Sequence, residues 1–177
     1  MQLIAYALPL LVNPEIFPMK KLALVLLATA TASAAYAAPM SASEYVMTSA
    51  ASDFYERTSS QVVLQSTRNP QIRAFAEMML SAHSQSTAEI KTAAGRSGLK
   101  PIPPRMTALQ TEMITQLRAE RGTARDAAYL AQQRAAHNGA LNVQKAYATE
   151  GSSAPLRSVA QTIVPMVESH IAMLMKM

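Results

Sequence analysis

Apolar residues recur along most of the chain at alternating steps of three and four positions, the spacing that places them on one face of an α-helix. Proline and glycine interrupt this pattern at a few points and divide the chain into segments. The pattern predicts five helices, over about residues 42–67, 70–96, 106–121, 123–150 and 154–177. No segment alternates with the period of two that marks a half-buried strand, so we predict an all-α protein.

Short polar side chains are expected to cap these helices. Ser41 or Ser43 precedes the first helix, and the Asn69-Pro70 pair ends it and opens the second. Thr123, followed by Asp126 three residues later, resembles a capping box at the start of the fourth helix. The helices therefore have local start signals as well as the right periodicity.

Four of the predicted helices are long and similar, with about 23 to 28 residues, or roughly 35 to 42 Å at 1.5 Å per residue. Such helices suit a four-helix bundle. The connection from Gly98 to Thr123 contains the short helix 106–121 and is long enough to cross the bundle. We therefore predict a ferritin-like four-helix bundle with one long crossover connection that contains a short extra helix.

The chain has three histidines, and each lies on the apolar stripe of a different long helix, near its middle. They are His83, His137 and His170. Helices that pack side by side would bring these imidazoles to one level. In the first helix Asp53 and Glu56 share such a stripe, where a carboxylate must be paired or bind a metal. The sequence predicts a mid-bundle layer of Glu56, His83, His137 and His170.

Two interpretations of this layer stay open. Neutral imidazoles and a carboxylate suit Zn, Fe, Mn or Cu, and the spacing does not separate these metals. Alternatively, the layer is a buried hydrogen-bonded network that fixes helix register, in a non-enzymatic envelope or stress-related module. A di-iron oxidase is not indicated, because the chain lacks the Glu-x-x-His pairs that such sites use.

Methionine gives a weaker signal of its own. Met78 and Met79 lie in the second helix, and Met173, Met175 and Met177 lie at the end of the last. Thioether sulfur is a soft ligand that suits Cu(I), so a copper-handling role is a third hypothesis. Filling gaps in the core is the simpler role for these side chains.

Composition narrows the chemistry further. Half of the residues are hydrophobic, but only 5% are aromatic, so Ala, Leu, Val and Met must form the core. The chain has no cysteine, which excludes disulfides and thiolate metal sites. No Ser/His/Asp order and no glycine-rich phosphate loop is present, so no catalytic residue is assigned and an enzymatic activity is left open.

The N-terminal part resembles a secretory signal. Met19-Lys20-Lys21 is followed by an apolar run over 22–27 and by small residues up to Ala38, with a small-x-small cleavage motif ending at Ala37. Residues 1–18 are interpreted as an extension upstream of the true start, 19–37 as the signal peptide, and 38–177 as one periplasmic domain without a stable membrane span. The alternative is a membrane anchor over 22–38, although half of that segment is only weakly apolar.

The charge of the chain does not indicate a nucleic-acid partner. The net charge is +5, and it becomes +4 without residues 1–37, which leaves 14 basic and 10 acidic residues. The basic residues are scattered along the helices, and no aromatic residues interleave with them. Substrate, protein partners and oligomeric state are not predicted.

A set of short motifs resembles one protein family. The motifs are Tyr45-Val46 with Ala50-Ala51 and Glu56, Phe75-Ala76-Glu77-Met78 leading to His83, Asp126 and Tyr129 leading to His137, and Val164-Pro165 leading to His170. Their order and spacing resemble the bacterial DUF4142 family over about 43–173, which implies an exported ferritin-like bundle without an established activity. The chain departs from the family pattern at Ala82, where an aspartate is usual, and at Arg125, where an aromatic residue is usual.

Overall fold

A computed structural model describes residues 39–100 and 102–177, and this part of the chain consists of helices, turns and loops without a strand. The five helices are α1 (Ala42–Leu64), α2 (Pro70–Arg96), α3 (Ala108–Ala119), α4 (Gly122–Glu150) and α5 (Ala154–Leu174). The all-α prediction is confirmed. The predicted upstream extension and signal peptide lie outside the described residues.

Side chains cap the N-termini of three of the five helices, α1, α2 and α3. Ser41 and Glu44 make a capping box on α1, and the Asn69 side chain accepts hydrogen bonds from the first turn of α2. A capping box that the sequence analysis did not identify, made by Thr107 and Gln110, opens α3. Each satisfies backbone N–H groups that have no partner within the helix.

The capping box predicted at Thr123 is wrong. Helix α4 begins at Gly122, after Arg121, and no side chain caps it. Asp126 instead is buried and accepts a hydrogen bond from the Thr67 hydroxyl, 3.1 Å from its Oδ2 atom. The first helix, predicted to reach 67, accordingly ends at Leu64, because Thr67 belongs to the turn that leads to α2.

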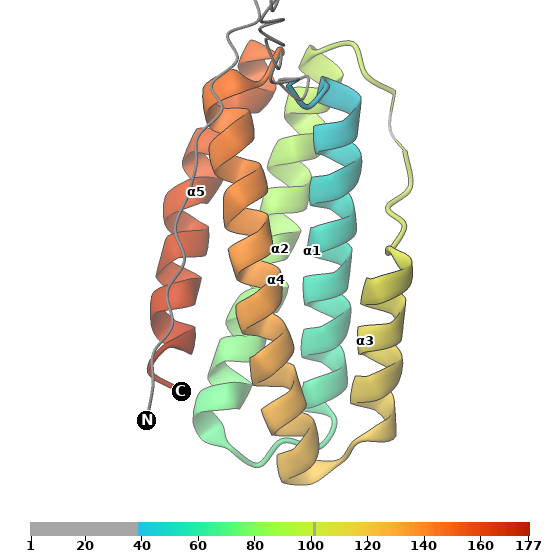
Figure 1. Cartoon of the computed structure of the whole chain (residues 1–177), viewed down its shortest axis with the longest axis vertical. Coiled ribbons are helices and arrows are strands. Elements are labelled where there is room, and N and C mark those ends of the chain that lie inside the picture. The colour runs from blue at the N-terminus through green and yellow to red at the C-terminus, as the bar shows by residue number, and fades with distance from the viewer. Residues whose placement is uncertain (1–38, 101) are drawn as a thin grey trace, which may run out of the picture. The chain divides into compact units, whose positions relative to one another are not determined.

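The four long helices form a bundle of two antiparallel hairpins (Figure 1). One hairpin is α1 with α2 and the other is α4 with α5, and α1 also packs on α4 while α2 packs on α5. Helices α2 and α4 run in the same direction, so the chain must return along the bundle between them (Figure 1). An extended connector and α3, which packs on α1 and α4, make this crossover. The predicted ferritin-like connectivity is confirmed.

The apolar core is divided into two clusters at opposite ends of the bundle. The first surrounds Tyr55, Phe75, Met79, Leu117 and Tyr129, and the second surrounds Tyr45, Ile90, Tyr147, Leu156 and Ile163. Along each long helix, buried polar residues lie between the stretches that belong to the two clusters. A polar layer therefore crosses the middle of the bundle.

Residues Ala37–Met177 form one compact unit that contains all five helices and both apolar clusters. Among the described helices, none combines the length and the hydropathy that a bilayer-spanning segment needs. Helix α5 continues through Pro165.

Two glycines at different positions in the bundle give a matched test of this packing. At Gly139, inside α4, an added Cβ meets nothing within 4 Å, whereas at Gly151 it would lie 2.6 Å from the Tyr147 carbonyl oxygen. We expect Gly139→Ala to stabilise the protein by roughly 0.5–1 kcal/mol, because alanine favours the helix. Gly151→Ala should destabilise it, since Tyr147 is fully buried and cannot move away freely. Urea unfolding measures both, and a stabilising Gly151→Ala would contradict the packing described.

Candidate metal centre

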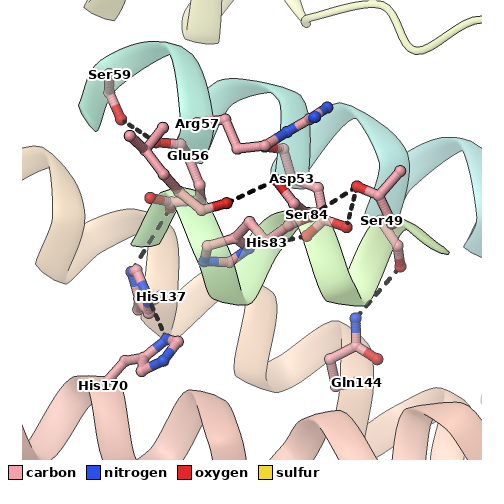
Figure 2. Close-up of polar contacts among 12 residues, drawn as sticks. Ser49, Asp53, Glu56, Arg57, Ser59, His83, Ser84, His137, Gln144 and His170 are labelled. Carbon is pink, nitrogen blue, oxygen red and sulfur yellow. Dashed lines mark hydrogen bonds and ion pairs between the residues drawn. The ribbon is translucent and has the colours of Figure 1, made fainter. Parts of the chain in front are cut away.

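Three helices each bring one histidine into the polar layer: His83 from α2, His137 from α4 and His170 from α5. All three are buried, with exposed fractions of 4%, 1% and 3%. One ring nitrogen of each lies within 4.8 Å of one nitrogen of each of the others. Figure 2 shows His137 and His170 close together, with His83 facing them from the neighbouring helix. The structure thus brings the three predicted histidines together.

The rings of His137 and His170 face each other through nitrogen atoms. His137 Nε2 lies 3.3 Å from His170 Nδ1. His137 Nδ1 lies 2.9 Å from the carbonyl oxygen of Gln133, which can only accept, so Nδ1 carries the proton and Nε2 presents a lone pair. Two nitrogens bound to one tetrahedral ion at about 2.0 Å would be about 3.3 Å apart, the same separation.

His83 is oriented by a carboxylate on the neighbouring helix. Its Nδ1 atom lies 2.8 Å from Oδ1 of Asp53, and the second oxygen of Asp53 accepts a hydrogen bond from the Thr87 hydroxyl at 2.9 Å. These contacts hold the ring with Nε2 turned away from Asp53. His83 Nε2 is buried and has no hydrogen-bond partner.

Glu56 lies beside the three histidines. Its Oε1 atom is 3.6 Å from Nδ1 of His137, on the side of that ring which does not face His170. Both carboxylate oxygens are buried and have no hydrogen-bond partner, and the residue is 1% exposed. Of the four predicted members of the layer, Glu56 therefore lies next to the three histidines but is outside the group of three whose nitrogens converge within 4.8 Å.

The sequence analysis did not identify three residues that support the centre, two through their side chains and one through its backbone carbonyl. Asp53 was placed on the buried stripe without a role, and Thr87 and Gln133 were not singled out. Gln133 precedes His137 by four residues, the spacing at which a helical side chain meets a backbone carbonyl. That spacing was visible in the sequence, whereas the pairing of Asp53 with His83 depends on how α1 and α2 rotate against each other.

Burial governs the protonation of these groups. It lowers the pKa of His137 to about 3 and that of His170 to about 4, and positive charge on His83 acts in the same direction. Burial also lowers the pKa of His83, but the Asp53 hydrogen bond and the charge of Glu56 outweigh it, so the net shift is upward. His137 and His170 are therefore neutral at pH 7, and each ring has one nitrogen with a lone pair.

Burial raises the pKa of Glu56 to about 7, although the positive charge of His83 opposes the shift. Near neutral pH this carboxyl group is therefore about half protonated. A cation placed among the histidines would favour its charged form.

The methionines lie mainly in the core. Met79 is fully buried in the first apolar cluster, and Met78, Met173 and Met177 pack against the same cluster. Met175 is 80% exposed. Gap-filling therefore accounts for four of the five methionines that the sequence analysis singled out.

The fold and the centre define a class: a ferritin-like four-helix bundle with a buried cluster of three histidines. Residues 27–177 match the family described as a domain of unknown function, DUF4142, and the chain belongs to this family. No curated protein matches the chain.

One solved structure shares the fold. It is the crystal structure of a DUF305 fragment from Deinococcus radiodurans, with a TM-score of 0.65 and 14% sequence identity, over 76% of this chain and 93% of that chain. At this identity the likeness supports the bundle and says nothing of its chemistry.

Replacing Glu56 by glutamine tests the electrostatics of the layer. Because the pKa of Glu56 is about 7 in the folded protein, against an ordinary value of 4.5, the folded state binds more protons between these values than the unfolded state. The contribution of Glu56 to the stability of the folded protein is therefore fully present below about pH 4.5, and it is lost as the pH rises through 7. In metal-free buffer at pH 8 we expect Glu56→Gln to be more stable than the parent by on the order of 3 kcal/mol.

At pH 4.5 the two proteins should unfold at nearly the same urea concentration. A stability difference of the same size at both pH values would show that the charge of Glu56 is not its cause.

Proposed function

We propose that this protein binds one transition-metal ion between α2, α4 and α5, with His83, His137 and His170 as ligands. The observation that carries the proposal is the convergence of three buried ring nitrogens within 4.8 Å of one another. A fourth ligand of the metal would be either a water molecule or the nearby carboxylate of Glu56.

The balance of donors and acceptors supports a cation in this layer. Both oxygens of Glu56 are buried without partners and His137 Nε2 presents a lone pair, and His83 Nε2, also buried without a partner, presents a lone pair when that ring is neutral. An unsatisfied buried polar group costs roughly 1–3 kcal/mol. A metal ion would supply the missing positive partner for several of these atoms at once.

The hydrogen bonds around the histidines also match a metal centre. Ligand histidines usually donate their second N–H group to a carboxylate or to a backbone carbonyl, which fixes the ring. His83 meets Asp53 in this way and His137 meets the carbonyl of Gln133. The donor set of imidazoles with a neighbouring carboxylate suits Zn, Fe, Mn or Cu.

We further propose that the metal is bound in the periplasm. The support is the signal-like sequence over 19–37, with the domain beginning at Ala38. The proposal is a metal-binding role without an assigned reaction. The competing proposal is a structural envelope module, which the hydrogen bonds from His83 to Asp53 and between His137 and His170 favour.

A metal titration of the Ala37–Met177 unit separates the two proposals. We expect Zn, Cu, Fe or Mn to bind at one ion per chain and to raise the melting temperature, because an ion that binds only the folded state stabilises it by about 2.7 kcal/mol at 100 times Kd. His83→Gln and His137→Gln should abolish this binding. Ser86→Ala, a buried neighbour one turn from His83, is the control and should bind normally. If no metal binds stoichiometrically, or if both histidine variants bind as the parent does, the histidines are structural.

Asp53→Asn tests whether the carboxylate acts through His83. Loss of the charged hydrogen bond should lower metal affinity roughly 10- to 100-fold at unchanged stoichiometry, because the ring is held less firmly and its nitrogen is less basic. Asp126→Asn changes another buried aspartate, which bonds Thr67 instead, and should leave affinity unchanged. Equal affinities for parent and Asp53→Asn, measured by competition with a chelator, would remove Asp53 from the centre.

A further inference from the structure

A cavity lies beside Asp53, and none of the three histidines lines it. Helices α1 and α2 and the start of the connector line this partly open cavity, which has a volume of about 650 Å³. Its walls are mostly apolar and include Val46, Ala50, Ile90, Ala94, Leu99 and Ile102. A volume of roughly 300–1,000 Å³ with apolar walls and few polar groups is typical of small-molecule sites.

The charged residues around this cavity are mostly positive. Arg57, Lys91 and Lys100 line it, against the single carboxylate of Asp53. Asp53 already has partners for both oxygens, namely His83 and Thr87. The cavity therefore presents excess positive charge beside apolar walls.

Arg57 is the best-fixed of the three cations. Its Nε atom donates to the carbonyl oxygen of Asp53 at 3.3 Å, and the residue is half-buried, whereas Lys91 and Lys100 are exposed. Figure 2 shows Arg57 extending along α1 above Asp53, away from the histidines. A guanidinium held by Nε keeps its terminal N–H groups free for an acid, which it can bind with two parallel hydrogen bonds.

We propose that this cavity binds a small amphipathic acid, with an apolar chain or ring against Ile90 and Leu99 and the acid group on Arg57. The apolar part of such a ligand matches the apolar walls of the cavity, and its negative charge matches the excess positive charge of the lining residues. The site is separate from the three histidines, and the inference does not depend on the metal.

The experiment uses the Ala37–Met177 unit in the presence of a chelator, with 8-anilinonaphthalene-1-sulfonate as a fluorescent apolar anion. We expect saturable binding at one dye per chain. Decanoate should displace the dye at least tenfold more effectively than decyltrimethylammonium, because only the acid can pair with Arg57. Arg57→Gln should weaken decanoate about tenfold and remove this preference.

Substitutions at two glycines test where the ligand binds. Gly95 lines this cavity and Gly139 lines a different groove between α1, α3 and α4, and at both an added Cβ meets nothing within 4 Å. Gly95→Phe should fill the cavity and reduce dye affinity at least tenfold, while Gly139→Phe should bind as the parent does. If Gly95→Phe does not melt cooperatively, Gly95→Leu replaces it.

The proposal is overturned if the parent shows no saturable binding, or if both glycine variants bind equally. It is also overturned if Arg57→Gln keeps the preference for decanoate. Because metal is absent throughout, these outcomes are independent of the metal titration.

Discussion

The burial of a polar layer in the middle of the bundle is the constraint on which the rest of the structure depends. Asp53 and His83 tie α1 to α2 through a 2.8 Å contact, and His137 and His170 tie α4 to α5 through one of 3.3 Å. Apolar clusters lie on both sides of this layer. A shift of one helix by one turn would move a charged or polar group into an apolar cluster, so the layer fixes the register of all four long helices.

The same burial leaves polar groups of the layer without hydrogen-bond partners. Both oxygens of Glu56 and the inner nitrogen of His83 are buried without a hydrogen-bond partner. A proton can bind to Glu56, as its raised pKa reflects, and a metal ion is the alternative partner that we propose for the layer. Proton and metal then compete for the same lone pairs, so a site of this kind binds metal more weakly as the pH falls.

Much of the fold could be predicted from the sequence, because helix ends and faces are local properties. Asn69 with Pro70 marks the start of α2, and periodicity alone places each histidine on a buried face. Contacts between helices could not be predicted in this way. Asp126 does not form the predicted capping box because it accepts a hydrogen bond from Thr67, and the choice of Asp53 over Glu56 as the partner of His83 depends on helix rotation. The periodicity of the sequence predicts neither of these two contacts.

Hydrogen bonds form at or next to Ala82 and Arg125, the two positions at which the sequence departs from the pattern of the family it resembles. An aspartate is missing at Ala82, just before His83, yet His83 still has a carboxylate partner, because Asp53 reaches it from α1. At Arg125, where the family usually has an aromatic residue, the buried guanidinium donates to the carbonyl oxygens of Val62 and Glu120 and so joins the end of α1 to the start of α4. The first departure leaves the orientation of the candidate ligand intact. The second exchanges apolar packing for hydrogen bonds at the end of the bundle, far along α4 from His137.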